Sequence, residues 1–324
     1  MAEISSSALA ELAARLTGRK VRSVAPGGRG GNNRLYRVEC GDGAVFALKS
    51  YPRTPGDTRD RLGTEFAALS FLARHGVSEV PAALAREGDH ALYQWIEGEP
   101  VTEPREGDID AALAFATRLH GLRRAEGADS LAWASEACTS GVEILRQVDQ
   151  RLARLRQVAS DHDGLPRVLD AIAAAVEACR PLAAAIGELA EDSRTLSPAD
   201  FGFHNALRTA GGRLIFIDFE YFGRDDPVKL AAEFDLHPGM SLPASLSAHW
   251  HRGIKAVYEN VPGFEARWIA FRPLLAARWA LIVLNEFLPE RWARRLAAGE
   301  SDAGAARARQ LDKARILLGK VSDR

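Results

Sequence analysis

Cysteine and excess charge of either sign are both scarce in this chain. Its three cysteines, Cys40, Cys138 and Cys179, are odd in number, far apart and without metal-ligand spacing, which fits structural thiols in a reducing cytoplasm. A formal net charge of −1 gives no sign of a nucleic-acid footprint. We therefore expect neither a metal-cysteine site nor a polyanionic main partner.

Long apolar runs are also lacking. The N-terminal stretch "MAEISSSALAELAARL" has no basic region and no apolar core of a secretion signal. The most apolar run, "LLAARWALIVLNEFL", is interrupted by Arg278 and is too short to span a bilayer. These shortages predict a cytoplasmic protein that does not contact a membrane.

What is present is an ordinary globular composition, with 47% hydrophobic and 26% charged residues. A chain of 324 residues is longer than one core comfortably fills, so two lobes are expected. Residues 21–52 predict three antiparallel strands, with a glycine-rich turn in "GGRGGNNR" and a tight turn in residues 41–43. The next segment predicts a helix that carries one apolar stripe of four residues, Leu62, Phe66, Leu69 and Leu72.

Long amphipathic helices follow from about residue 108, because apolar residues recur at helical spacing. Only "TLSPADFGFHNALRTAGGRLIFIDFEYF" interrupts them, and its two β-rich runs flank "TAGGR", a hairpin signal. The sequence therefore predicts an α+β fold with a small antiparallel-sheet lobe in residues 1–95 and a larger helical lobe in residues 96–324.

Several residues have the types and order that phosphoryl transfer needs, namely charge neutralisation, metal ligands and a carboxylate that orients the attacking hydroxyl. Glycines between two strands can bring backbone N–H groups close to a triphosphate, although a plain flexible hairpin has the same pattern. Lys49 lies on a strand between apolar neighbours, and Glu65 follows on a helix. Singly, these two residues would be interpreted as solvated charges; together they match a lysine held by a glutamate.

The interrupting segment supplies the remaining groups. Asp200 would accept a hydrogen bond from the substrate hydroxyl, while Asn205 and Asp218 would bind Mg²⁺ through oxygen ligands. A turn aspartate after Pro198 and a strand-end aspartate are the structural alternatives for Asp200 and Asp218.

The full order of these parts resembles the aminoglycoside phosphotransferase and choline kinase family, whose members have a protein-kinase-like bilobal fold. The matching stretches include "GGRGGNNRLYRV", "FALK", "YQWIEGEP", "DFGFHN" and "IDFEYFGRDDPVKLA", within residues 20 to 240. The resemblance implies ATP and Mg²⁺ as cofactors and a hinge at residues 94–97 that binds adenine. Together these inferences assign nucleotide binding to Gly28, Gly30, Gly31, Asn33, Lys49, Glu65, Gln94 and Ile96, metal binding to Asn205 and Asp218, and catalysis to Asp200.

The chain departs from the family pattern at two positions. Pro198 stands where the family usually has a histidine that supports the catalytic loop, and Lys229 stands where it often has an aspartate. Asp225 or Asp226 is expected to cap the following helix. For His237 a substrate-facing role and a structural turn remain equally open.

The preferred interpretation is a kinase for the hydroxyl of a small molecule, a sugar or amino alcohol. The segment after Asp218 is too short to be a protein-kinase activation segment, which argues against a protein substrate. The basic balance of the tail from Arg291 onward predicts a neutral or anionic acceptor, with an aminoglycoside as the alternative. A catalytically silent nucleotide-binding module is the rival function, and the oligomeric state stays open.

Overall fold

The structure is a computed structural model that describes residues 6–29, 33–52, 57–240, 242–297 and 301–322. The chain forms two compact units. The first comprises Met1–Glu103, Arg124–Ala132 and Phe203–Gly223, and the second comprises Pro104–Arg123, Trp133–Gly202 and Arg224–Arg324. The first contains most of the β-structure and the second is mainly helical, so the predicted α+β class is confirmed.

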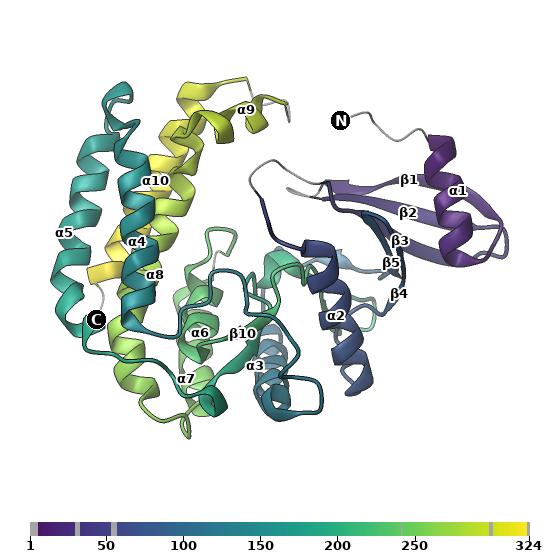
Figure 1. Ribbon diagram of the computed structural model, residues 1–324, viewed down its shortest axis with the longest axis horizontal. Helices are drawn as coiled ribbons and strands as arrows, with labels where there is room; N and C mark the ends of the chain where they lie inside the picture. Colours follow the sequence, from purple (N-terminus) through teal and green to yellow (C-terminus); the bar gives the residue numbers. More distant parts are fainter. Residues whose placement is uncertain (1–5, 30–32, 53–56, 241, 298–300, 323–324) are drawn as a thin grey trace. The chain divides into compact units, whose positions relative to one another are not determined.

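A five-stranded antiparallel sheet organises the first unit (Figure 1). In the order β1-β2-β3-β5-β4, its strands are β1 (Val21–Arg29), β2 (Arg34–Cys40), β3 (Val45–Ser50), β5 (His90–Gln94) and β4 (Ala83–Glu87). Helix α1 (Ser6–Thr17) packs on one face, where its Leu9 and Ala13 join Leu48 in a buried apolar cluster. Successive strand residues point to opposite faces, so Lys49 projects from the other face.

A second helix and a short sheet complete the first unit. Helix α2 (Arg61–Arg74) begins at Asp60, whose side chain accepts a hydrogen bond from the Gly63 N–H. The predicted hairpin is present as β8 (Ala206–Arg208) and β9 (Leu214–Phe216), and β6 (Glu99–Pro100) pairs with β8. A helical turn, η4 (Phe203–Asn205), leads into this hairpin.

The apolar stripe predicted on α2 is only partly correct. Leu69 and Leu72 are buried, but Leu62 and Phe66 are only partly buried. Arg61 and Glu65 occupy the buried face in their place. The reason is that this face meets other charged groups of the first unit, which compensate the two buried charges.

Helix α8 is the centre of the second unit, where α4, α5, α6 and α10 all contact it. The remaining bounds are α3 (Glu106–Gly121), η1 (Leu122–Arg124), α4 (Gly141–Arg156), η2 (Ala159–Asp161), α5 (Leu165–Ala184), η3 (Glu191–Ser193), β7 (Thr195–Ser197), β10 (Gly223–Asp225), α6 (Pro227–Leu236), α7 (Ala244–Val257), α8 (Phe264–Val283), η5 (Leu284–Phe287), α9 (Pro289–Ala297) and α10 (Ala303–Ser322). Strand β7 pairs with β10. The helical periodicity predicted from about residue 108 onward is confirmed in α4 and α5, where the buried residues recur at helical spacing. They are Leu145, Val148, Leu152 and Leu155 in α4, and Val168, Ile172 and Val176 in α5.

The apolar run around Arg278 belongs to a longer helical segment than its sequence suggested. Residues Phe264–Phe287 are long and apolar enough to cross a membrane by length and composition, which corrects the expectation that the run is too short. However, 67% of the apolar part of this segment is buried inside the protein. Such burial is typical of the core helix of a helical unit.

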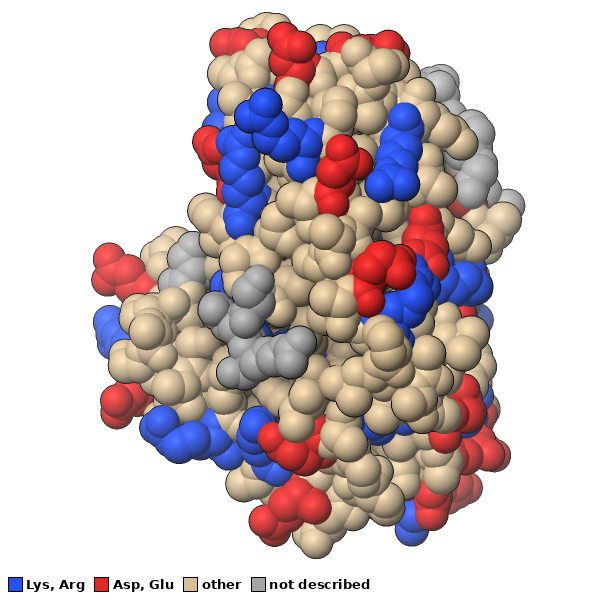
Figure 2. All heavy atoms as spheres, turned by 90° about the vertical axis from the view of Figure 1, so that its left-hand side faces the viewer, with Lys and Arg blue, Asp and Glu red and all other residues tan. Residues whose placement is uncertain are grey.

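Helix α6 of the second unit is buried along its whole length, because every residue from Pro227 to Leu236 is buried. Asp226 caps its N-terminus by accepting a hydrogen bond from the Val228 N–H, and Pro227 occupies the first turn. The expected cap is therefore confirmed and assigned to Asp226. On the face drawn in Figure 2, basic and acidic side chains are interspersed, as the balanced composition predicts.

Candidate active site

Lys49 is the centre of a charged cluster in the first unit. Its Nζ lies 2.7 Å from Glu65 Oε2 and 2.7 Å from Asp218 Oδ1. Strand β3 presents the lysine, helix α2 presents Glu65, and the segment after β9 presents Asp218. The structure thus brings together three residues that the sequence assigned to one site, although they are far apart along the chain.

Burial differs among these three side chains. Lys49 is 12% exposed and Glu65 4%, whereas Asp218 is 37% exposed. Burial alone would lower the pKa of Lys49, but the carboxylates of Glu65 and Asp218 outweigh it and raise that pKa above its usual range. Lys49 is therefore a fixed positive charge, and Asp218 is the member of the cluster that reaches solvent.

Glu65 is held by more than the lysine. Tyr51 donates its hydroxyl hydrogen bond to Glu65 Oε2 at 2.7 Å, and the backbone N–H of Phe219 donates to Oε1 at 3.4 Å. The Tyr51 and Tyr93 hydroxyls lie 2.7 Å apart. Sequence reasoning missed both tyrosines; the only signal was that Tyr51 follows Lys49 by two residues and so shares its strand face.

The β8–β9 hairpin places the two predicted metal ligands at its base. Asn205 precedes β8 and Asp218 follows β9, and the Asn205 carbonyl accepts a hydrogen bond from the Ile217 N–H at 2.9 Å. Asp218 has a backbone φ of +67°, which a residue with a side chain adopts at a cost of about 1–2 kcal/mol. Such strain is often found at functional residues.

Oxygen ligands suitable for a hard cation gather beside Asp218. Carboxylate oxygens of Glu65, Asp218 and Glu220 lie within 4.8 Å of one another. All three carboxylates accept hydrogen bonds, Glu65 and Asp218 from Lys49 and Glu220 from Asn33. Asp218 is the best placed of the three to bind an ion, because it is 37% exposed and the two glutamates are nearly fully buried. Because Mg²⁺ prefers oxygen ligands and keeps several waters, the residues present fit that ion.

The glycine-rich turn is described only in part. Gly28 has φ +147°, a conformation that favours glycine, and it follows a bulge at Gly27 where a Cβ would come within 3.1 Å of Leu35. Gly30 and Gly31 lie outside the described residues. The turn therefore requires glycine at its first half, and its contact with phosphate stays a prediction.

Asn33 is built into a buried network. Its Oδ1 accepts a hydrogen bond from Arg61 at 2.8 Å, and its Nδ2 donates to Glu220. Arg61 and Glu220 are themselves nearly fully buried. This network connects the end of the glycine turn to α2 and to the segment after Asp218, and the sequence did not reveal it.

Gln94 and Ile96 lie where β5 ends. Gln94 is exposed, and its backbone N–H donates to the Ala82 carbonyl at 2.9 Å. Ile96 is partly buried. Both residues lie at the end of the strand that pairs with β3, the strand of Lys49. Their role as a nucleotide hinge stays a prediction.

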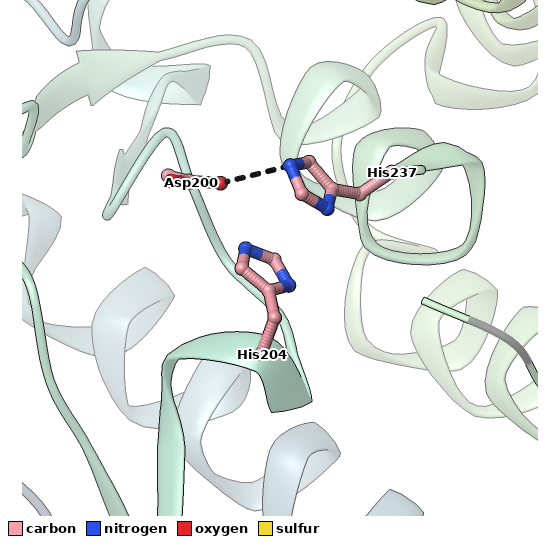
Figure 3. A group of neighbouring side chains, drawn as sticks. All are labelled: Asp200, His204 and His237. Atoms are coloured by element: carbon pink, nitrogen blue, oxygen red, sulfur yellow. Dashed lines mark ion pairs between the residues drawn. The ribbon is translucent and has the colours of Figure 1, made fainter. Parts of the chain in front are cut away.

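Asp200 belongs to the second unit, where a strained loop presents it. Ala199 immediately before it has φ +63°, and the Ala199 N–H donates to Ser197 Oγ at 3.1 Å. Figure 3 shows the Asp200 carboxylate facing the ring of His237, with Oδ1 and Nε2 3.3 Å apart. His237, whose role was open at the level of sequence, therefore contacts the predicted catalytic residue.

A cavity of about 720 Å³ lies in the second unit beside α4. Its lining includes the half-exposed Trp133 and equal numbers of acidic and basic side chains. The charged residues of the lining are Glu136, Glu143, Glu188, Arg146, Arg151 and Arg154. Its volume lies within the usual range of sites for small molecules, but neither Asp200 nor His237 lines it.

The sequence and the fold of this chain are similar to those of known phosphotransferases. The family model described as the phosphotransferase enzyme family matches residues 23–232, which is more than half of the chain. A search of curated protein sequences finds no match.

Solved structures with similar folds include kinases of several small molecules. A spectinomycin phosphotransferase, APH(9)-Ia, in complex with ADP and spectinomycin is 13% identical, with a TM-score of 0.63 and 99% and 98% of the two chains covered. The choline kinase LicA from Streptococcus pneumoniae is 15% identical, with a TM-score of 0.60 and coverage of 97% and 98%. An ethanolamine kinase from Plasmodium vivax is 12% identical, with a TM-score of 0.56 and coverage of 90% and 82%. At these identities the likeness shows the fold, so the predicted kinase-like fold is confirmed.

Proposed function

Because the chain belongs to the phosphotransferase enzyme family, we propose that it transfers the γ-phosphoryl group of ATP to a hydroxyl of a small molecule, with Mg²⁺ bound. The observation that carries this proposal is the contact of Lys49 with both Glu65 and Asp218. A lysine held by a glutamate and lying beside a metal-binding aspartate is the arrangement that kinase-type enzymes need to bind the phosphates.

The residues of the first unit would bind the nucleotide. Lys49 would neutralise phosphate oxygens, while Glu65 holds its ammonium group in one position. Asp218 and Asn205 would hold the metal ion, which supplies charge neutralisation at the phosphate oxygens. The half-exposed Asp218 carboxylate supports this assignment, because a metal ligand must reach the bound nucleotide.

Asp200 would act on the acceptor. It would accept the proton of the acceptor hydroxyl as that oxygen forms a bond to the γ-phosphorus. The bond from the γ-phosphorus to the bridging oxygen breaks at the same time, and ADP leaves with the electron pair. The 30% exposure of the Asp200 side chain is compatible with contact to a substrate.

We propose a neutral or anionic acceptor rich in hydroxyl groups. A polycation needs a pocket with net negative charge, whereas basic residues outnumber acidic ones in the tail from Arg291 onward. The cavity beside α4 does not bear on this choice, because neither Asp200 nor His237 lines it. The basic tail now supports this choice less than its composition suggested. Two of its basic residues are balanced locally, since Arg295 pairs with Glu286 and Arg315 with Asp312.

A phosphorylation screen with ATP and Mg²⁺ tests this function. The panel contains sugars, sugar acids, amino alcohols and aminoglycosides, and Asp200→Asn is the matched control. We expect turnover of one hydroxyl compound, and a loss of roughly 10²–10⁴-fold in the variant with nearly unchanged ATP binding. Equal turnover by the variant contradicts the role of Asp200. Efficient phosphorylation of an aminoglycoside contradicts the proposed acceptor charge, and nucleotide binding without turnover of any compound favours the silent module.

A further inference from the structure

His237 is held in place from both sides within the second unit. It ends helix α6, and its backbone N–H donates to the Glu233 carbonyl at 3.0 Å. Because α6 is buried along its whole length, the position of its last residue is well determined. The imidazole ring also meets Trp279 of α8 edge-on, with the ring centroids 4.5 Å apart. Its orientation is therefore set before any substrate binds.

The backbone selects one tautomer of this ring. The N–H of Gly239 donates a hydrogen bond to His237 Nδ1 at 3.0 Å. An imidazole nitrogen that accepts a hydrogen bond carries no proton, so in the neutral ring the proton is on Nε2. Nε2 is the atom that lies 3.3 Å from Asp200 Oδ1. The ring therefore presents an N–H group to the carboxylate.

We propose that His237 is a positioning residue for Asp200: its Nε2–H donates a hydrogen bond to Oδ1 and fixes the direction of the carboxylate. This inference rests on the proposed function, because it assumes that Asp200 acts on the acceptor hydroxyl. Pro198, two residues before Asp200, has no N–H group and no polar side chain to offer. The hydrogen bond from His237, at the end of α6, would instead stabilise the Asp200 carboxylate, which follows the strained residue Ala199.

The same geometry excludes His237 as the final proton acceptor in this pose. A neutral ring that donates through Nε2 could take a second proton only at Nδ1, and Nδ1 accepts from Gly239. The proton of the acceptor hydroxyl consequently stays on Asp200 until it leaves to solvent or product. His237 orients the carboxylate and does not accept that proton.

Two substitutions separate positioning from packing. His237→Gln places an amide N–H near the former position of Nε2 but loses the aromatic ring. His237→Phe keeps an aromatic ring against Trp279 but offers no donor. Positioning predicts that Phe lowers kcat by up to about 10²-fold with little change in KM, and that Gln recovers most of the loss. A purely structural role predicts the reverse order, so near-normal kcat in Phe with a defect in Gln overturns the proposal.

A spectroscopic measurement tests the pair without an acceptor. In protein labelled with ¹⁵N at histidine, the His237 signal is assigned by its absence in His237→Gln. We expect a proton on Nε2, and a shift of that resonance in Asp200→Ala at unchanged fold. A proton on Nδ1, or an Nε2 resonance that is the same in the wild type and in Asp200→Ala, overturns the inference even if the protein phosphorylates an acceptor. If the expected shift is seen but no acceptor is phosphorylated, the proposed function fails and the pairing of His237 with Asp200 stands.

Discussion

The two units each contain a cluster of lysine and carboxylate side chains, and we infer different roles for the two clusters. The site cluster, in the first unit, consists of Lys49, Glu65 and Asp218. The core cluster, in the second unit, consists of Asp225, Lys229, Glu233 and Arg278. Each has a lysine within about hydrogen-bond distance of two carboxylates, so charge pairing alone does not tell them apart.

Solvent contact and backbone strain distinguish the clusters. Lys229 is 2% exposed and its partners Asp225 and Glu233 0% and 6%, whereas Asp218 of the site cluster is 37% exposed. Asp218 also has a positive φ, while Lys229 and Glu233 lie in the regular helix α6. A closed cluster stabilises the fold, and a cluster with one exposed, strained carboxylate can bind a ligand.

The core cluster also explains the lysine at a position where the family resemblance led us to expect an aspartate. Burial alone would lower the pKa of Lys229, but Asp225 and Glu233 outweigh it and raise that pKa. Its ammonium lies 2.8 Å from Asp225 and 3.1 Å from Glu233. Lys229 therefore balances buried carboxylates.

Removing the lysine of the core cluster has the largest expected effect on stability. Lys229→Met leaves Asp225 and part of the Glu233 charge uncompensated, so we expect a loss of about 3–5 kcal/mol in the free energy of unfolding. Urea denaturation followed by circular dichroism measures this loss. Lys49→Met is the matched control and should cost less, since Asp218 reaches solvent. Equal losses would remove the distinction between the clusters.

Removing the lysine of the site cluster is expected to affect rate more than stability. Lys49→Met deletes one fixed positive charge at the phosphates, so kcat should fall by about 10²–10³-fold, with weaker ATP binding. Steady-state kinetics with the acceptor found in the screen measures both effects. A variant with unchanged kcat shows that Lys49 does not contact the transferred group.

Glu65→Gln should give a smaller defect of the same kind, on the order of tenfold in kcat, or about 1.4 kcal/mol. The reason is that Glu65 would act on the nucleotide through Lys49, which it holds in position, and glutamine can still accept from Tyr51. A double-mutant cycle with Lys49→Met measures the coupling between the two residues. A defect larger than that of Lys49→Met means that Glu65 mainly braces the fold.

Local patterns explain which features could be predicted from the sequence. Strand alternation, helical periodicity and turn residues predicted the sheet, the long helices and the hairpin. The order of lysine, glutamate and aspartate predicted the site cluster, because each residue has a fixed place on a strand, a helix or a hairpin. The family resemblance also assigned Asp200 and Asn205 to one loop, because both lie in the stretch "DFGFHN".

Other features depend on packing that no local pattern encodes. Arg61 and Glu65 take the buried face of α2 because charged partners arrive from distant segments. The contact of His237 with Asp200 joins two segments that are far apart in the chain, and it depends on the length and burial of α6. Lys229 lies one helical turn from both Asp225 and Glu233, so its pairing follows from helical spacing. Its complete burial depends on the surrounding helices and could not be predicted from the sequence.

The central claim, that the site cluster binds ATP through a metal ion at Asp218, is tested most directly by ATP titration with and without Mg²⁺. Isothermal titration calorimetry compares the wild-type protein with Asp218→Ala and, as a control, with Asp200→Asn. We expect Mg²⁺ to strengthen ATP binding to the wild type and to Asp200→Asn, and to have little effect on Asp218→Ala. The same Mg²⁺ dependence in Asp218→Ala as in the wild type would contradict the account.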